Sequence, residues 1–489
     1  MKKATTETPE TAAETMTPAV NDRPEDGGRP EAAPSEARPR VPRPKRARSR
    51  RVAGVAARSS AEAAEAAGAT AAAPAPHILI IGGGGTGGAL AHDLTLRGLR
   101  VTLVERGEIT SGTTGRHHGL LHSGARYATT DRAAAIDCSG ENKILRRIAP
   151  GSFEENDGLF VALTDEDEEY EKQFTEACWQ CAVPATRLDR DTALRMEPGL
   201  NPALRFAIQV PDATMDAMRV PLRFFATARR AGADIRPFTE VVAFTSSTAA
   251  DGSGRTVSGV KVRDHAAGRE YEIGADIVVN AAGAWAGKVA ALAGVDVPVV
   301  ASPGVMVAVR GRHTNMVVNR LHAPGDGDIV VPQRLLTVVG TSSWIAADPD
   351  DLTVPADHVA AILRESSELV PAIARAEVRA TWAAARPLIG VAPGSGLAAA
   401  AAPAAAPAAA MAAALAAAGR GLPRETRCFD HATDATPTEG FVTIAGGKAT
   451  TLRAMAEITA DVICAKLGLD RPCQTREVVL LPHTAWYRA

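Results

Sequence analysis

The pattern of apolar and polar positions predicts a βαβ unit that begins near residue 77. Residues 78–81 are consecutive isoleucine and leucine residues, which is typical of a strand buried on both faces. A glycine run follows, and then a helical stretch in which Leu90 and Leu94 lie one turn apart before Gly98 ends it. Residues 101–104 form a second short apolar run. This order of strand, glycine turn, helix and strand predicts two parallel strands joined by a helix.

Later segments repeat parts of this pattern. Residues 275–283 suit a strand that ends in small residues, and residues 440–464 suit a short strand, a glycine turn and an amphipathic helix. Shorter strand patterns in residues 155–215 and 300–395 suit an antiparallel sheet. We therefore expect an α/β fold in which a Rossmann-like domain is built from discontinuous segments and is joined to an antiparallel-sheet substrate domain of α+β type. The expected ranges are 76–155, 215–300 and 425–470 for the first domain, 156–214 and 301–396 for the second, and 471–489 for a C-terminal tail.

Two segments have a separate, low-complexity composition. Residues 1–75 are rich in Ala, Pro, Glu and Thr without apolar periodicity, so we expect a disordered extension. Eight basic residues within 38–51 could meet nucleic acid or an anionic membrane, but we interpret them as a solvated tail and expect no nucleic-acid partner. Residues 397–424 are mostly alanine and contain Pro403 and Pro407, which predicts a surface insertion rather than a membrane span.

Composition narrows the class of protein. The 489 residues include 46% hydrophobic residues and six cysteines and carry a net charge of −2, which suits a globular chain without a disulfide framework. Cys178 and Cys181 form a C-x-x-C pair, but no second pair accompanies them, so we interpret them as structural thiols and expect no metal site. The N-terminus lacks the apolar core of a signal peptide, which predicts a cytoplasmic location.

The glycine run carries a specific chemistry. Gly82, Gly84 and Gly87 form G-x-G-x-x-G between the predicted strand and helix. The first glycine permits the tight turn, the second lets the backbone approach a pyrophosphate, and the third allows close packing of helix on strand. Glu105 ends the second strand, where an acid accepts hydrogen bonds from ribose hydroxyls. The motif predicts a dinucleotide site, and the small-residue stretches 280–285 and 445–448 favour the elongated FAD over NAD.

Taken together, these motifs resemble the FAD-dependent glycerol-3-phosphate dehydrogenases of the D-amino-acid-oxidase-like superfamily, and in particular the catalytic subunit of the anaerobic respiratory enzyme. The resemblance runs from about residue 77 to about residue 480. It rests on the stretches GGGGTGGALAHDLTLRGLRVTLVER, GLLHSGARY, GLFVALT, NPALRFAIQVPDATMDAMR, VVNAAGAWAG, ARPLIG and GFVTIAGGKATTLRAMAE. It implies oxidation of sn-glycerol 3-phosphate to dihydroxyacetone phosphate, with hydride transfer to flavin N5 and electrons passed to quinone or to partner subunits.

The resemblance also implies site residues. Residues 116–127, RHHGLLHSGARY, concentrate His, Arg and Tyr beside the expected flavin, as a phosphate ester and a proton transfer require. Arg126 and Tyr127 resemble substrate ligands, Arg386 a second substrate ligand that also acts in catalysis, and Arg320 a further substrate ligand.

For the catalytic step, His122 is the candidate base and Lys448 resembles a lysine near flavin and substrate. The cofactor residues implied are Gly82, Gly83, Gly84, Gly87, Glu105, Arg106, Thr114, Gly115, His118, Gly119, Val242, Ala282, Gly283, Gly447 and Lys448.

The chain also departs from the family pattern. Residues 302–306 read SPGVM where the family often has Lys-Gly-Ser, and Ala449 and Leu452 follow Lys448. The catalytic subunit of the anaerobic enzyme continues into a cysteine-bearing segment that does not follow here, so quinone, a separate partner and oxygen stay open as acceptors. Two alternatives also stay open, namely a 2-hydroxyacid or amine oxidase of the same superfamily and a flavin-binding protein without this turnover. Contact with a membrane is expected to be peripheral, at the inner face.

Overall fold

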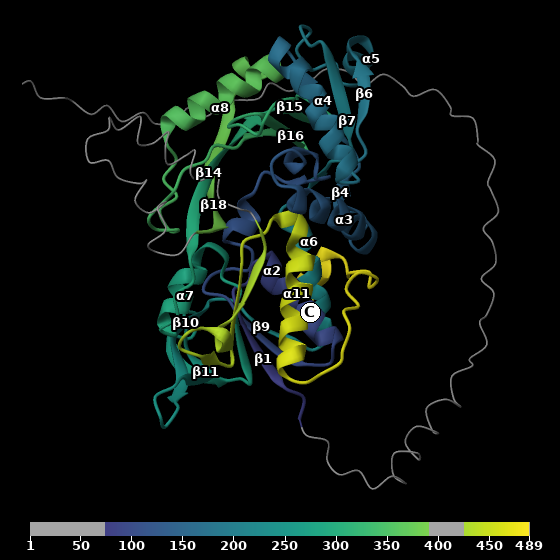
Figure 1. Cartoon of the computed structure of the whole chain (residues 1–489). Coiled ribbons are helices and arrows are strands. Elements are labelled where there is room, and N and C mark those ends of the chain that lie inside the picture. The colour runs from purple at the N-terminus through teal and green to yellow at the C-terminus, as the bar shows by residue number, and fades with distance from the viewer. Residues whose placement is uncertain (1–73, 391–424, 489) are drawn as a thin grey trace, which may run out of the picture. The chain divides into compact units, whose positions relative to one another are not determined.

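The predicted βαβ unit opens the part of the chain that the structure describes. This computed structural model describes residues 74–390 and 425–488 (Figure 1). The unit comprises β1 (His77–Ile81), α2 (Gly85–Leu96) and β2 (Arg100–Val104), and the two strands pair in parallel. The predicted N-terminal extension, up to residue 73, and the predicted insertion at 397–424 lie outside the described residues.

Segments far apart in the sequence lie side by side in a six-stranded sheet. Its strand order is β19, β21, β13, β1, β2 and β9, and all neighbours are parallel except β19 and β21. The strands outside the βαβ unit are β9 (Asp234–Arg236), β13 (Ile277–Asn280), β19 (Arg427–Asp430) and β21 (Phe441–Ala445). The strand patterns predicted at 275–283 and 440–464 therefore join the first βαβ unit in one sheet.

Both faces of this sheet are covered, which explains why its strands are continuously apolar. Ile78 and Ile80 pack against α2, α6 (Arg219–Arg230) and α11 (Leu452–Lys466) on one face. Leu79 and Ile81 point to the other face, where antiparallel strands and a short helix cover them. These covering elements are β10 (Thr239–Thr248), β11 (Arg255–Asp264), β12 (Arg269–Gly274) and α7 (Ala286–Leu292), and β20 (Thr438–Glu439) pairs with β11.

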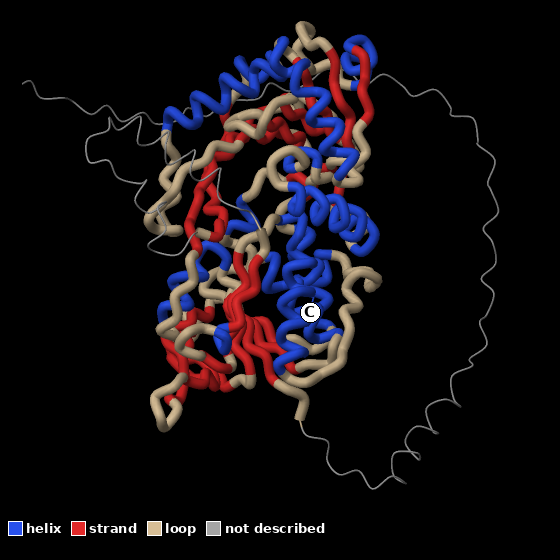
Figure 2. Tube along the Cα trace, viewed as in Figure 1, coloured by secondary structure: helices blue, strands red, loops and turns tan. Residues whose placement is uncertain are grey.

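A second sheet of eight strands confirms the expected antiparallel architecture. Its order is β18, β14, β17, β16, β15, β5, β7 and β6, and only the neighbours β15 and β5 are parallel. Figure 2 shows these strands in red as a curved sheet. The bounds are β5 (Gly158–Ala162), β6 (Thr186–Asp189), β7 (Phe206–Val210), β14 (Val299–Arg310), β15 (Val317–Arg320), β16 (Ile329–Gln333), β17 (Leu336–Gly340) and β18 (Val378–Ile389).

Helices cover both faces of the second sheet. One face packs against α8 (Ala356–Leu369) and α5 (Arg190–Met196), and the other against α4 (Asp165–Gln180) and α3 (Arg132–Ile148). A capping box starts α4, because Thr164 and Asp167 each accept a hydrogen bond from the other's backbone N–H. A small third sheet is formed by β3 (Leu120–Leu121), β8 (Ala213–Met215) and β4 (Phe153–Glu154).

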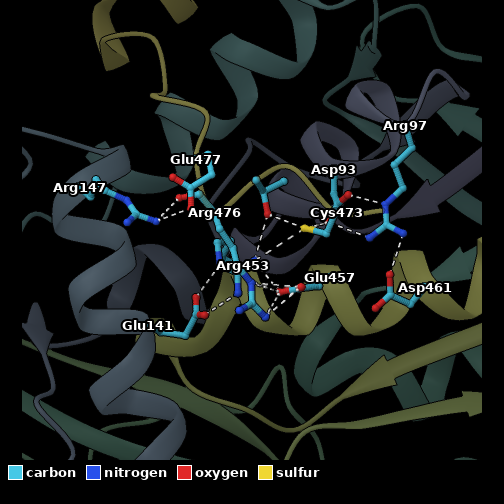
Figure 3. A network of polar contacts seen from close by, with 11 residues as sticks. Asp93, Arg97, Glu141, Arg147, Arg453, Glu457, Asp461, Cys473, Arg476 and Glu477 are labelled. Atoms are coloured by element: carbon cyan, nitrogen blue, oxygen red, sulfur yellow. Dashed lines mark hydrogen bonds and ion pairs between the residues drawn. The ribbon is translucent and has the colours of Figure 1, made fainter. Parts of the chain in front are cut away.

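A buried ionic network ties the helices of the first sheet to the C-terminal residues (Figure 3). Arg453 of α11, 1% exposed, donates to Glu141 of α3 at 2.5 and 2.8 Å and to Glu457 at 2.7 Å. Arg97, at the end of α2, donates to Asp93 and to Asp461, each at 2.7 Å. Cys473 Sγ donates to Asp93, and Thr475 accepts from Arg453, so the tail is joined to the same network. These contacts hold α2, α3 and α11 in a fixed arrangement.

Candidate functional site

A cavity of about 610 Å³ is lined by residues from both sheets. Its wall runs from the ends of β1 and β2, past residues 111–122, to β18 and the turn before α11. The predicted site residues that line it are Gly82, Gly84, Glu105, Arg106, Thr114, His118, His122, Tyr127, Ala282, Gly283, Arg386, Gly447 and Lys448. The predicted residues outside its lining are Gly83, Gly87, Gly115, Gly119, Arg126, Val242 and Arg320.

The glycine motif shapes one end of the cavity. Gly82 has φ of +115°, and a Cβ there would lie 2.6 Å from the carbonyl oxygen of Ala281. A Cβ on Gly87 would lie 2.0 Å from the carbonyl oxygen of Gly82, so this glycine lets α2 approach β1. Gly84 caps α2 without a side chain and lines the cavity. The N-terminus of α2 is therefore open to the cavity, a geometry that suits a pyrophosphate.

Backbone hydrogen bonds fix the acid at the end of β2. The Glu105 carboxylate accepts from the N–H of Gly83 at 2.7 Å and from the N–H of Gly107 at 2.8 Å. A Cβ on Gly83 would lie 2.8 Å from the Cβ of Glu105, so Gly83 makes room for the acid rather than lining the cavity. An oriented carboxylate at this place suits the hydroxyls of a ribose.

Three predicted cofactor residues lie beside the cavity without lining it. A β-bulge separates Val241 from Ala243 in the β10–β11 pairing, so the structure places Val241 rather than Val242 on the wall. Gly115 donates its N–H to the carbonyl of Thr110 at 2.8 Å. Gly119 has φ of +83°, and a side chain there would overlap Gln333. The two glycines therefore shape the loop that bears the histidines.

His122, Tyr127 and Lys448 meet at the other end of the cavity. His122 Nε2 lies 3.4 Å from the hydroxyl of Tyr127, and the His122 N–H donates to Thr450 Oγ1 at 3.1 Å. Lys448 Nζ lies 4.6 Å from the centre of the Tyr127 ring. Gly447, with φ of +72°, forms the tight turn that places Lys448 on the wall. A titratable imidazole, a phenol and an ammonium group thus share one surface.

The departure at residues 302–306 has a structural reason. These residues belong to β14, where Ser302 pairs with Arg386 of β18. A Cβ on Gly304 would lie 2.3 Å from a guanidinium nitrogen of Arg386, so the glycine makes room for that side chain. Arg386 donates to Thr341 Oγ1 at 2.5 Å and to the Ser342 carbonyl at 3.1 Å. Residues 302–306 (SPGVM) therefore leave space for the Arg386 guanidinium group on the cavity wall.

The structure does not bring Arg126 or Arg320 to the cavity wall. Arg126 donates to Asp328 at 2.7 Å, and both side chains are almost fully buried. Arg320 donates to Asp167 at 3.2 Å and to Glu368 at 2.7 Å. Both were expected as substrate ligands, but each is paired with an acid that is distant in the sequence. A sequence motif identifies residues that are adjacent in the chain, but it does not show which acidic residues the folded chain places beside them.

A polar cluster at the cavity rim was not predicted from the sequence. Asp350, from the segment between β17 and α8, accepts from Arg106 at 2.7 Å, from the Trp285 indole at 2.8 Å and from Lys288 at 3.1 Å. Although burial opposes ionisation, the three donors lower the pKa of the Asp350 carboxyl to about 2. Trp285 was visible in the NAAGAW stretch, but nothing local marked Asp350 as its partner.

Two further lining residues, His117 and Arg116, flank the reactive end. The Nδ1 of His117 accepts from the N–H of Gly119 at 2.9 Å, and burial lowers its pKa to about 4. A neutral His117 therefore orders the loop backbone. Arg116 accepts at its carbonyl from the Trp382 indole at 2.6 Å. The spacing of these residues from the glycine motif gave no sign of either contact.

The residues present fit a flavin dinucleotide. Three glycines open the α2 terminus, a fixed carboxylate suits a ribose, and the cavity continues from there to residues of the second sheet. Among the described residues, no group of three or more His, Cys, Asp or Glu is arranged to hold a metal ion. No helix within 74–390 and 425–488 is both long and apolar enough to cross a membrane.

Comparison with known proteins agrees with this geometry. Residues 77–421 match the FAD dependent oxidoreductase family. The A subunit of the anaerobic glycerol-3-phosphate dehydrogenase of Escherichia coli (strain K12) is 38% identical over 405 residues, which are 82% of this chain and 69% of that protein. The A1 subunit of the Haloferax volcanii enzyme of the same name is 40% identical over 412 residues, which are 82% of this chain and 66% of that protein.

A solved structure shares the fold. The glycerol-3-phosphate dehydrogenase from Bacillus halodurans, complexed with FAD, superposes with a TM-score of 0.61 at 23% identity and covers 85% of this chain and 70% of that chain. At this identity the likeness bears on the fold alone. The family match spans well over half of the chain and includes the glycine motif and the cavity wall. The chain is a member of the FAD-dependent oxidoreductase family.

Proposed function

We propose that this protein oxidises sn-glycerol 3-phosphate to dihydroxyacetone phosphate. The observation that carries the proposal is the joint presence of Arg386 and Lys448 on the wall that also bears His122 and Tyr127. Two cationic side chains suit a phosphate ester, and an imidazole suits the removal of a hydroxyl proton. The name shared by relatives at 38–40% identity supports the same substrate.

The cofactor is held by residues from separate segments. The α2 terminus at Gly84 receives the pyrophosphate, and Glu105 binds the ribose hydroxyls. Bound FAD would supply the acceptor for a hydride from C2 of the substrate. Gly447 and Lys448 place backbone and ammonium groups at the cavity end that the flavin ring would reach.

Side chains of the protein bind the substrate and take up its proton. Arg386 binds the phosphate through its planar guanidinium, which Gly304 and Thr341 hold in place. His122 takes the C2 hydroxyl proton at Nε2, and the Tyr127 hydroxyl, 3.4 Å away, orients that ring. Lys448 adds positive charge at the same end of the cavity. The position of Arg386, His122, Tyr127 and Lys448 in the lining of one cavity supports these roles.

Quinone or a partner electron-transfer protein would be the electron acceptor. The relatives are named as subunits, which supports a partner. A quinone acceptor would fit the expected cytoplasmic location with peripheral contact at the inner face of the membrane.

The first experiment is an anaerobic reduction. The purified flavin-loaded protein is mixed with glycerol 3-phosphate, and absorbance is followed at about 450 nm, where oxidised flavin absorbs. Rapid bleaching supports the proposal. Glycine, a 2-hydroxy acid and glycerol serve as comparison substrates. Bleaching by an amine or hydroxy acid, but not by glycerol 3-phosphate, would overturn it in favour of a related oxidase.

A further inference from the structure

We propose that Gln333 is a positioning residue that holds residues 116–119, here called the histidine loop, in the place that flavin reduction requires. The side-chain amide of Gln333 donates to backbone carbonyls of this loop, although Gln333 itself does not line the cavity. This inference rests on the proposed function, because it concerns how the loop supports His122 beside the substrate. Gln333 belongs neither to the glycine motif nor to the stretches that resemble the family.

The side-chain amide of Gln333, at the end of β16, joins three backbone carbonyls. Its Nε2 atom donates to the carbonyl oxygens of His118 at 3.2 Å, Gly119 at 3.3 Å and Met215 at 3.1 Å. An NH2 group must lie at this position, because the amide oxygen has no hydrogen to offer these acceptors. Gln333 therefore ties the histidine loop to Met215 at the end of β8.

The backbone around this amide is shaped to receive it. Gly119 has φ of +83°, and a Cβ there would overlap Nε2 of Gln333 and lie 2.5 Å from the Met215 carbonyl oxygen. The Met215 N–H donates to the Gly119 carbonyl at 2.7 Å, so the two segments are paired where the amide lies. The next residue, Arg334, donates to Asp216 at 2.7 Å. The end of the β16–β17 hairpin is therefore fixed against the segment that follows β8.

The histidine loop adjoins the candidate base. His117 and His118 line the cavity, and the short strand β3 leads from the loop to His122. The His118 ring packs edge-on against the His122 ring, with ring centres 5.9 Å apart. The carbonyls that Gln333 binds belong to His118 and to Gly119, the residue after it. Release of the loop from Gln333 would therefore shift the His118 ring and the surface against which His122 packs.

The test uses the full-length, flavin-loaded protein and two variants at position 333. Gln333→Met keeps the length of the side chain without a donor, and Gln333→Glu keeps its shape but places a carboxylate against three carbonyl oxygens. Anaerobic stopped flow with glycerol 3-phosphate gives the limiting rate of flavin reduction and the substrate concentration at half-maximal rate. We expect Gln333→Met to lower the limiting rate about five- to thirtyfold and Gln333→Glu to lower it further. Half-saturation should stay within twofold, because Arg386 and Lys448 lie on other elements.

Hydrogen exchange locates the effect without any turnover. Because the Met215 N–H donates to the Gly119 carbonyl, peptides that cover residues 116–122 and 213–216 report on release of the loop. We expect these peptides to exchange about fivefold faster or more in both variants. Peptides from β13 and α11 should exchange as in the wild type, which separates a local release from a general loss of stability.

Gln209→Met is the matched control. Gln209 lies in β7 of the same sheet and donates through its side-chain amide to Asp157 at 2.8 Å, but it does not line the cavity. This variant should change neither the limiting rate nor the exchange of the histidine loop. A limiting rate within twofold of the wild-type rate in both variants at position 333 would overturn the proposal. An equal loss of rate in Gln209→Met would also overturn it.

The exchange measurement keeps the positioning role and the proposed function apart. If Gln333→Glu does not fold, Gln333→Met still decides, because it places no charge beside the carbonyls. A wild-type flavin that glycerol 3-phosphate leaves oxidised would overturn the proposed function, while exchange of residues 116–122 would still show whether Gln333 holds the loop. Unchanged exchange in Gln333→Met would overturn the positioning role even in an active enzyme.

Discussion

Two regions of the molecule are rich in arginine, and they use it differently. In the ionic network that joins α2, α3 and α11, Arg453 and Arg97 each form ion pairs with two carboxylates (Figure 3). On the cavity wall, Arg386 donates to a threonine hydroxyl and a backbone carbonyl. Neutral acceptors orient a guanidinium without cancelling its charge, whereas carboxylates cancel it. The partners of an arginine, rather than its motif, therefore indicate whether it serves stability or binding.

The largest effect is expected from breaking the network. Arg453→Met leaves Glu141 buried without its cation, while Glu457 keeps Arg476 at 3.0 Å, and should lower the free energy of unfolding by about 3–5 kcal/mol. Denaturant unfolding of the flavin-loaded protein measures this. Adding Glu141→Gln should restore part of the loss, since the buried carboxylate that Arg453 paired is then replaced by a neutral amide. A loss under about 1 kcal/mol would contradict the view that this region is purely structural.

The second largest effect is expected for Arg386 on the cavity wall. Arg386→Ala should lower kcat/KM for glycerol 3-phosphate by about 30- to 160-fold, since a charge-assisted hydrogen bond contributes roughly 2–3 kcal/mol. The unfolding midpoint should move less than in Arg453→Met, because the described acceptors of Arg386, Thr341 Oγ1 and the Ser342 carbonyl, carry no charge. Steady-state kinetics with and without the phosphate group on the substrate provide the check. A large loss of stability with unchanged kinetics would reverse the two roles.

A smaller effect concerns a buried group without a partner. Both ring nitrogens of His92 in α2 lack a hydrogen-bond partner among the described residues, and burial lowers its pKa from 6.5 to about 4. The folded state therefore binds fewer protons than the unfolded state below pH 6.5, and stability falls as the pH drops from there toward 4.

His92→Leu should reduce this fall by on the order of 1–2 kcal/mol between pH 7 and pH 5. Urea unfolding at the two pH values is the measurement. His117, whose burial also lowers its pKa to about 4, should keep part of the dependence in the variant. An unchanged pH dependence would show that His92 is not buried in its neutral form.

The smallest effect is expected at the cavity rim. Asp350 is about half exposed, so its contacts with Arg106 and Lys288 are worth little individually. Asp350→Asn should speed FAD dissociation about two- to threefold at low salt, and the difference should vanish at high salt, where surface charges are screened. Flavin release after dilution measures both conditions. Asp351→Asn is the neighbouring control, and an equal effect there would remove any specific role for Asp350.

The local sequence was sufficient to predict the dinucleotide end of the cavity. The strand, glycine turn, helix and acid lie within residues 77–105, so neighbours in the chain are also neighbours in space. The antiparallel nature of the second sheet was also predictable, because most of its strands are short and bounded by turns. A bulge moved the wall residue from Val242 to Val241, since an extra residue in one strand changes which side chains face inward.

The residues alone were enough to predict the fold class and the glycine cradle for FAD, and to single out Arg126, Tyr127, His122, Arg386 and Lys448. The partners of these residues became visible only in the folded protein. It paired Arg126 with an acid 202 positions away and placed Gly304 under the guanidinium of Arg386. The physical reason is that the use of a charged group depends on its burial and its partners, and both come from strands that meet only when the sheets form.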